Sequence, residues 1–470
     1  MNPTSVLGPH PADAGRPRAR CCCEPAGSGP LASLLVIDDL QLQSSELLQR
    51  LIRFNTVNPP GNERLAQEAL AGLLGDAGFE VDLLGAVPER PNLVARLRGD
   101  ADGPVLCLLS HVDTVLATPE DWTHDPWSGD LADGCIWGRG ALDMKSQTAV
   151  EVAAALSLAR SGWRPARGDL LVVVVVDEEV GGELGAMWIC EQHPDKVRCD
   201  YLLNEGGGAV IPFDGNRYYG VCVAEKGVFR FRLTTEGVAG HASIPKIGDN
   251  ALLKMAPLLA RMAERQPSFD LTEGPRALLE GLGLEPNGDP AAALTRLRER
   301  DAGLALLVEP LLGVTLAPTR ISASQKINVI PASAELRVDC RIPPGLGEEH
   351  ALQRIREVLG DDGYRLEFTE RVVGNQSPVQ SPLMDAIERW VGEHDPGAIV
   401  VPTALAGFTD SRTFRDAFPD CVAYGFFPHR HMNLFETAPL IHAADERIDV
   451  RDLGFAAQFF RDVTREILGG

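Results

Sequence analysis

Three acidic residues follow the most apolar segment of the sequence without a spacer. Val172–Val176 is a run of five valines, and Asp177, Glu178 and Glu179 come directly after it. A valine run of this kind predicts a strand that is buried on both faces. A solvent-exposed turn is the ordinary explanation for acids after a strand. The sharper explanation is a site that needs carboxylates held rigidly at the end of a central strand.

Further polar clusters follow other apolar segments. The segments CLLSHVDTV, GRGALDMKS and YLLNEGGG contribute His111 with Asp113, Asp143 in a glycine-rich turn before a helix, and Glu205. In an open α/β sheet, the loops at the carboxyl ends of neighbouring strands converge on one crevice. Acids that meet there repel one another unless a cation neutralises them. Histidine and carboxylates without a thiolate suit zinc, cobalt or manganese, and two ions that share one carboxylate fit the number of ligands.

The first half of the chain alternates strands and helices that could position these residues. A helix and an alternating strand in NERLAQEALAGLLGDAGFEVDLLG precede the strands NLVARLRG and PVLCLLS, and Lys145–Arg160 is a helix. The valine strand, a helix through LGAMWICEQ and the strand DYLLN follow. This order predicts an α/β domain with a mostly parallel sheet flanked by helices.

The character of the sequence changes after Glu225. GVFRFRLTTEGV alternates like a half-exposed strand, a helix follows near residues 250–264, and Gln266–Pro318 is polar, irregular and marked by proline and glycine. Strands in INVIPASAELRVDCRIPPG and a helix in EEHALQRIREVLG complete a small α+β unit inserted into the larger domain. We therefore predict four segments: a disordered tail at 1–34, the catalytic domain at 35–225 and 373–470, and the inserted domain at 226–372.

Charge and cysteine usage exclude several classes of partner. A net charge of −22, from 44 basic against 66 acidic residues, argues against nucleic acid and against anionic membrane surfaces. The longest apolar run, Leu170–Val176, is far too short to span a bilayer, and no apolar segment of signal-peptide length follows the arginines near the start. The ten cysteines show no CxxC or zinc-ribbon spacing, which is typical of reduced thiols in the cytoplasm. Cys21, Cys22 and Cys23 stand together in the tail, whose composition indicates disorder.

Two other enzyme classes that use α/β sheets lack their motifs here. A nucleotide-dependent oxidoreductase needs GxGxxG after the first strand, and EVGGELG does not have that spacing. A serine hydrolase needs a GxSxG turn, which the sequence does not contain. The alternative from another class is a non-catalytic metal-binding or scaffold protein. Glu178 beside Glu179 argues against it, because a structural metal site has no use for a free base.

The order of motifs along the chain resembles that of a known family. Eight motifs follow one another in the same order as in the dinuclear zinc amidohydrolases, and the resemblance extends from about Leu47 to Leu468 of this chain. They are HVDTV, GRGALDMKS, DEEVGG, NEGG, GHASIP, NVIP, TDSRTFR and IHAADERI. That family contains aminoacylase, acetylornithine deacetylase, succinyl-diaminopimelate desuccinylase and glutamate-releasing carboxypeptidases. The resemblance implies a zinc-peptidase type of α/β fold whose inserted α+β domain is both a lid and the surface of a homodimer.

The resemblance also implies a role for each residue of the site. It implies two divalent ions, which are zinc, with cobalt or manganese as alternatives. The ligands of one ion are then His111 and Glu205, those of the other are Glu179 and His442, and Asp143 bridges the two ions. Glu178 is then the general base and Asp113 orients His111. His442 has no signal of its own, because it stands in an unremarkable loop and only the motif identifies it.

Three further residues match family positions that act on the substrate. The resemblance implies that His241 reaches the substrate carbonyl from a neighbouring subunit, that Asn328 is a polar lid residue, and that Arg412 pairs with the free carboxylate of the substrate. A surface salt bridge is the ordinary alternative for Arg412. The segment IHAADERI departs from the usual pattern between the histidine and the acid but leaves the ligand intact.

The implied activity is hydrolysis of an amide or peptide bond next to a free carboxylate, in small N-acyl amino acids or peptides, by metal-activated water. GFTDSR is more similar to the aminoacylase and carboxypeptidase branch than to the desuccinylases. A deacylase of the acetylornithine or succinyl-diaminopimelate type remains the alternative enzyme. The sequence leaves the acyl group, the amino acid and the native metal open.

Overall fold

The computed structural model describes residues 39–469. The cysteines Cys21, Cys22 and Cys23 lie outside these residues, so the predicted tail and its cysteines stay predictions. Among the described helices, none is both long and apolar enough to cross a membrane.

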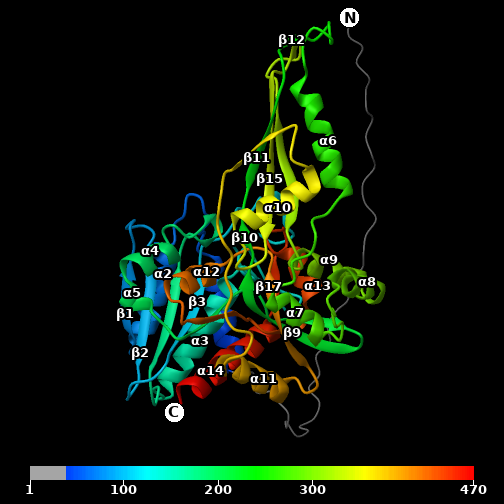
Figure 1. Cartoon of the computed structure of the whole chain (residues 1–470). Helices are drawn as coiled ribbons and strands as arrows, with labels where there is room; N and C mark the ends of the chain where they lie inside the picture. The colour runs from blue at the N-terminus through cyan, green and yellow to red at the C-terminus, as the bar shows by residue number, and fades with distance from the viewer. Residues whose placement is uncertain (1–38, 470) are drawn as a thin grey trace, which may run out of the picture. The chain divides into compact units, whose positions relative to one another are not determined.

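A ten-stranded sheet dominates the described part of the chain (Figure 1). Its strands β6, β3, β7 and β18 are neighbours and run parallel, while β1, β2 and β8 add antiparallel pairs toward the edges. The prediction of a mostly parallel central sheet is therefore confirmed. The strands are β1 (Glu80–Leu84), β2 (Asn92–Arg98), β3 (Val105–His111), β6 (Asp169–Val175), β7 (Tyr201–Asn204), β8 (Ala209–Phe213), β9 (Asn216–Glu225), β17 (Ile399–Leu405), β18 (Val422–Gly425) and β19 (His429–Asn433).

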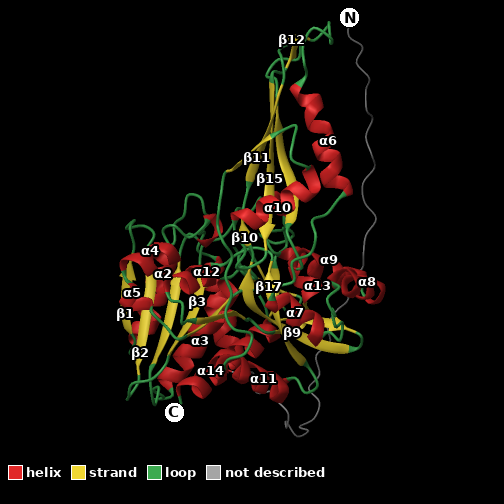
Figure 2. Ribbon diagram, in the orientation of Figure 1, coloured by secondary structure: helices red, strands yellow, loops and turns green. Residues whose placement is uncertain are grey.

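Helices cover both faces of this sheet (Figure 2). In the valine strand β6, Val172 and Val174 pack into one apolar cluster with the helices of the first face, and Val173 and Val175 pack into a second cluster on the other face. Because successive side chains of a strand point to opposite faces, an unbroken valine run is what two covered faces require. The first face is covered by α1 (Asp39–Ile52), α2 (Arg64–Asp76), α3 (Lys145–Arg160), α11 (Pro382–His394) and α14 (Val450–Leu468), and the second by α4 (Ala186–Gln192), α5 (Pro194–Val197) and α12 (Asp410–Ala417).

A second sheet of five antiparallel strands lies within residues 227–368. Helices α6 and α10 share one apolar cluster with it, and Figure 1 shows α6, β11 and β15 extending away from the larger sheet. The elements are β10 (Gly227–Val228), β11 (Phe231–Glu236), β13 (Thr315–Ser322), β15 (Ser333–Ile342), β16 (Arg365–Phe368), α6 (Ala251–Glu264) and α10 (Glu348–Leu359), with the short pair β12 (Gly240–His241) and β14 (Val329–Ile330).

The segment Gln266–Pro318 is helical in large part, so the prediction of an irregular chain was wrong there. It contains α7 (Glu273–Gly281), α8 (Pro290–Arg300) and α9 (Ala302–Val308). The side chains of Asp289 and Asp301 cap the second and third of these helices by accepting backbone N–H bonds. The proline and glycine residues that looked like loop signals separate short helices instead.

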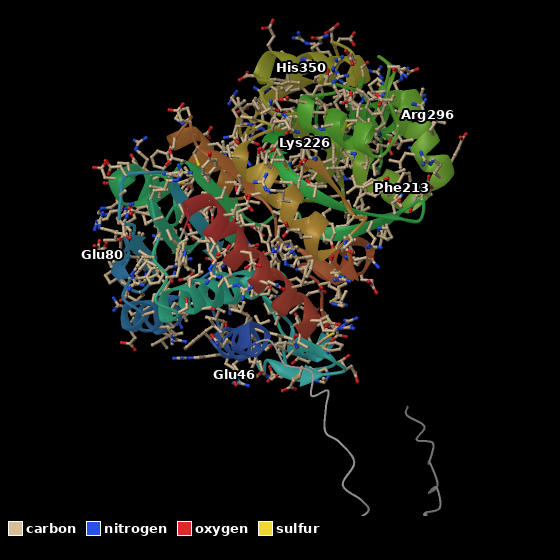
Figure 3. The ribbon with its side chains drawn as sticks, turned by 90° about the horizontal axis from the view of Figure 1, so that it is seen from below. Glu46, Glu80, Phe213, Lys226, Arg296 and His350 are labelled. Atoms are coloured by element: carbon tan, nitrogen blue, oxygen red, sulfur yellow. The ribbon has the colours of Figure 1, made fainter. Side chains whose placement is uncertain are left out.

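These three helices pack on the larger sheet. Their leucines share an apolar cluster with Ile211, Tyr218 and Val401 of strands β8, β9 and β17. The guanidinium of Arg300 in α8 lies 4.6 Å from the ring centroid of Phe213, and Figure 3 shows Phe213 and Arg296 on the same side of the molecule. Residues of α7 and α9 form part of the wall around the carboxyl ends of the strands. Where a lid domain begins and ends stays a prediction.

The remaining elements join these parts. A three-stranded sheet consists of β4 (Asp130–Ala132), β5 (Cys135–Trp137) and β20 (Arg447–Asp449), and α13 (Leu434–Thr437) follows β19. Strand β20 fixes the loop before it against β5, and that loop carries His442. This small sheet therefore brings a C-terminal histidine to the strand ends of the N-terminal half.

Candidate metal centre

Two groups of metal-ligating side chains lie at the carboxyl ends of the parallel strands. The first consists of His111, Asp143 and Glu205, and the second of Asp143, Glu179 and His442; within each group the ligand atoms lie within 4.8 Å of one another. His111 ends β3, while Glu179 and Glu205 follow β6 and β7. Because β6, β3 and β7 are adjacent and parallel, their ends deliver all three side chains to one place.

Asp143 belongs to both groups. Its Oδ1 lies 3.2 Å from His111 Nε2, and its Oδ2 lies 3.0 Å from His442 Nε2. Glu205 Oε1 is 3.7 Å from His111 Nε2, and Glu179 Oε2 is 3.2 Å from His442 Nε2. One carboxylate thus faces a histidine on each side, which is the arrangement of a ligand that bridges two ions.

The three acids after the valine strand have three different surroundings. Asp177 has a positive φ of 72° and turns back into the protein, where it accepts bonds from Arg90, Asn58 and the backbone N–H of Leu184. Glu179 points into the second ligand group. Glu178 belongs to neither group, and its Oε2 lies 3.8 Å from His111 Nε2. One acid is structural, one is a candidate ligand, and one is left free beside the ligands.

Asp113 fixes both the histidine and the acidic turn. Its backbone carbonyl lies 3.1 Å from His111 Nδ1 and its carboxylate 3.4 Å from the same nitrogen. The carboxylate also accepts 3.2 Å bonds from the backbone N–H groups of Glu178 and Glu179 and a 2.9 Å bond from Asn58. The side chain is fully buried. A partner on Nδ1 leaves Nε2 of His111 to face the ligand group, as metal-binding histidines require. Asn58 was not identified from the sequence, because its role depends on folding alone.

Glu446 holds the loop that carries Asp143. Its buried carboxylate accepts bonds from the backbone N–H groups of Leu142 at 2.6 Å and Asp143 at 2.9 Å, and from the Arg139 guanidinium at 2.6 Å. Arg139 also donates to the carbonyl of His442 at 3.4 Å. Glu446 and Arg139 therefore connect the shared ligand to the loop of the second histidine. Glu446 is the second of the two acids in the IHAADERI segment, so the motif contained a signal for it.

Protonation in this cluster reflects crowded negative charge. Burial raises the pKa of Glu178 and that of Glu205 well above their ordinary values, and the charge of Asp143 adds to the effect on Glu205. Burial alone would raise the pKa of Asp143 too, but hydrogen bonds from His111 and His442 hold it below its ordinary value. Hydrogen bonds to Asp143 and Glu179 raise the pKa of His442 to about 10. The cluster attracts protons, and divalent cations would supply the same positive charge.

The side chains present fit divalent metal ions. His111 Nε2 is buried and makes no hydrogen bond of good geometry among the described residues. The donor set consists of imidazole nitrogens and carboxylate oxygens without a thiolate, which suits zinc and related hydrolytic metals. Three candidate ligands at each position leave room for water and substrate, as catalytic zinc sites need.

Arg412 does not form the surface salt bridge that was its ordinary alternative. It lies in the first turn of α12, and its guanidinium carbon is 5.0 Å from the centroid of the Phe408 ring. Its Nε has no hydrogen-bond partner, and it makes no ion pair among residues 39–469. A half-buried guanidinium without a carboxylate partner is available for one from outside the chain.

His241 and Asn328 lie apart from the metal groups. Both are exposed, His241 in β12 and Asn328 directly before β14, and the backbone N–H of Ala242 donates to the carbonyl of Asn328 at 3.0 Å. His241 Nδ1 is 2.8 Å from Ser243 Oγ. Figure 1 shows β12 beyond the end of the five-stranded sheet that lies farther from the larger sheet. Within one chain, the structure brings the predicted metal ligands and base together but not these two residues.

A cavity of about 470 Å³ opens beside the two ligand groups. Asp143, Glu178, Glu179, Glu205 and His442 line one part of it. The rest is largely apolar and includes side chains of α7 and α9. The volume falls in the range of about 300–1,000 Å³ that is usual for sites of small molecules.

Comparison with known proteins agrees with this arrangement. The profile of peptidase family M20/M25/M40 matches residues 107–466. The chain is 26% identical over 375 residues to a probable carboxypeptidase S-like 2 of Dictyostelium discoideum, which covers 76% of this chain and 70% of the relative. It is 28% identical over 421 residues to a succinyl-diaminopimelate desuccinylase of Xanthobacter autotrophicus, covering 87% and 94% of the two chains. The fold is similar to that of an M20 family metallo-carboxypeptidase of Sulfolobus solfataricus, with a TM-score of 0.67, 17% identity and coverage of 90% and 98%.

Proposed function

This chain belongs to peptidase family M20/M25/M40 and is a hydrolase, and we propose that it cleaves the amide bond of N-acyl amino acids or small peptides with two bound zinc ions. We assign His111 and Glu205 to one ion, Glu179 and His442 to the other, and Asp143 to both. When bound, such a pair of ions supplies a nucleophilic water at neutral pH and polarises the amide carbonyl. The observation that carries the proposal is the single carboxylate with a histidine on each side.

The chain's own residues move the proton in this proposal. Glu178 lies beside both groups without joining either, so its carboxylate is free to take a proton from the attacking water and to pass it to the leaving amine. Asp113 keeps His111 in the orientation that a ligand needs and anchors the turn that carries Glu178. The neighbouring acids thereby have separate tasks.

We assign Arg412 to the free carboxylate of the substrate. A guanidinium matches a carboxylate with two parallel hydrogen bonds, and Arg412 Nε has no hydrogen-bond partner among the described residues. Its position on α12, one residue after the buried Ser411, keeps its backbone fixed. The substrate would therefore be a free acid, as amino acids and peptides are.

We further propose a homodimer in which His241 and Asn328 act on the partner's site. The segments around β12 and β14 and the start of α6 expose large apolar side chains near both residues, and an exposed apolar patch of this kind marks an interaction surface. These include Ile244, Ile247, Leu253, Ile327 and Val329. A histidine from a second subunit would donate a hydrogen bond to the carbonyl oxygen as charge develops there.

The described cysteines are all free, although the Sγ atoms of Cys199 and Cys421 lie only 3.6 Å apart. Thiols this close stay reduced in a reducing compartment, so we propose a cytoplasmic location. Partial oxidation of this pair in protein freshly isolated without reductant would contradict the proposal.

The proposed activity is tested with metal-free protein reloaded with zinc, cobalt or manganese. We expect hydrolysis of N-acetyl amino acids or dipeptides that rises with added metal and reaches its maximum near two ions per chain. The variant Asp143→Asn should lose most of this activity at equal metal concentration. Full activity of the stripped protein in chelator would refute the proposal.

A further inference from the structure

The cavity beside the metal centre continues into a region built largely from apolar side chains, most of them aliphatic. It is lined there by Ile211 of β8, Leu278 of α7, Leu304 and Val308 of α9, Leu311, and Leu434 of α13. Four of these six residues come from the helical segment that packs on the larger sheet, so its placement is what makes this region apolar. The proposed reaction does not use this region.

The approach from the metal centre into this region runs over bare backbone. Gly206, Gly207 and Gly208 follow Glu205 and line the cavity. A Cβ on Gly207 would stand only 2.5 Å from the carbonyl oxygen of Gly220, so no side chain fits at that position. A substrate bound at the ligand groups can therefore continue along this strip without a side chain in its way.

No lysine or arginine is among the residues that line the cavity. The one basic group there away from the ligand groups is His429, which is buried and whose ring nitrogens have no partner. Burial lowers the pKa of His429, so its ring is neutral at neutral pH. An anionic acyl group such as succinyl would lose its hydration here without gaining a cation, which is strongly unfavourable.

We propose that this apolar region binds the acyl half of the substrate as a long, uncharged hydrocarbon chain. The inference rests on the proposed function and deepens it by naming the acyl class. Arg412, which we assign to the carboxylate, lies 5.0 Å from the ring of Phe408, a residue that lines the cavity, so we assign the amino-acid half to that part and the acyl half to the apolar region. Each buried methylene gains free energy from leaving water, and kcat/KM should therefore rise with chain length until the region is filled.

The kinetic test compares N-acyl glycines that differ in the acyl group alone. With acetyl, hexanoyl and decanoyl glycine, we expect kcat/KM to rise by up to about fourfold per methylene, and N-succinyl glycine to be poorer than hexanoyl glycine. Leucyl-glycine, a dipeptide with a charged amine, should also be poorer than hexanoyl glycine. Equal values for acetyl and decanoyl glycine, or a preference for the succinyl compound or the dipeptide, would overturn the inference.

Two adjacent leucines of α9 provide a matched pair of variants. Leu307 lines the cavity and is 39% exposed, whereas Leu306 is 70% exposed and does not line it. Leu307→Asp should abolish most of the preference for decanoyl over acetyl glycine. Leu306→Asp should leave the whole series unchanged. Equal effects of the two substitutions would contradict the assignment.

A binding measurement separates this inference from the proposed reaction. Decanamide, an uncharged probe, should bind to the metal-free protein in titration calorimetry, with loss of binding in Leu307→Asp and retention in Leu306→Asp. Such binding without hydrolysis of any amide would refute the proposed function and leave the acyl site standing. Hydrolysis of acetyl glycine without decanamide binding in any form of the protein would refute the acyl site and leave the proposed function standing.

Discussion

Replacing Glu446 by alanine should damage both the stability of the fold and the binding of metal. The Glu446 carboxylate is fully buried and accepts bonds from Arg139, from the backbone N–H groups of Leu142 and Asp143, and from that of Gly140 at 3.2 Å. Alanine removes the acceptor for all four donors. The Arg139 charge then stays buried without a carboxylate partner, although its guanidinium still donates to the carbonyls of Leu116 and His442.

The structure sets the size of this effect. Removing one member of a buried ion pair costs about 3–5 kcal/mol. Each N–H left without an acceptor costs about 1–3 kcal/mol more, unless water or a small shift relieves it. The loss in free energy of unfolding should therefore be at least roughly 3–5 kcal/mol. Domains are stable by only about 5–15 kcal/mol, so most of the margin is at risk. The loop that carries Asp143 would loosen as well, and loss of such a supporting contact lowers metal affinity by about 10–100-fold.

Urea unfolding of the metal-free protein measures the first effect, and competition with a chromogenic chelator measures the second. Glu446→Gln keeps the shape and an acceptor oxygen, so it should fold and show smaller losses of the same sign. Glu466→Ala breaks the exposed ion pair with Arg389 and serves as the control, with an expected cost of about 0–1 kcal/mol. If Glu446→Ala unfolds within about 1 kcal/mol of the wild type, or binds metal equally well, the reasoning is refuted.

Three further predictions concern the reaction itself. Glu178→Ala should keep its metal and lose about 10²–10⁴ in kcat, whereas Glu179→Ala should lose metal; equal metal content in the two variants would show that their roles are not divided. Arg412→Lys should raise KM for free-acid substrates and change it little for the matching amides, because lysine cannot form the paired hydrogen bonds; equal changes for both would remove the assignment. A mixture of the inactive variants Glu178→Ala and His241→Ala should regain activity on subunit exchange, since a hybrid dimer contains one intact site; a mixture that stays inactive would place His241 outside the partner's site.

The sequence was sufficient for the sheet and for the residues at its strand ends. The valine run and the strands before His111 and Glu205 have strong patterns, and the parallel direction of β6, β3 and β7 follows from the strand and helix alternation. His442 was accessible only through the resemblance, because it lies in a loop at a positive φ of 62° with no periodicity around it. A single histidine in such a loop has no signature in composition.

Other features depend on tertiary placement that no local pattern encodes. Asp177, Glu178 and Glu179 are similar in sequence, and only the fold turns Asp177 toward Arg90 and away from the ligands. The helices of residues 266–318 are too short and too often interrupted to show a clear period. Their leucines are buried only because the ends of the larger sheet accept them. The sequence alone therefore does not predict the apolar lining of the cavity, which depends on where these helices pack.

The central claim is that Asp143 joins two metal ions, and anomalous diffraction from crystals of the zinc-loaded protein tests it directly. We predict two anomalous peaks at the zinc edge, one between His111 and Glu205 and one between Glu179 and His442, with Asp143 in contact with both. A single peak, or two peaks of which Asp143 contacts at most one, would contradict the account.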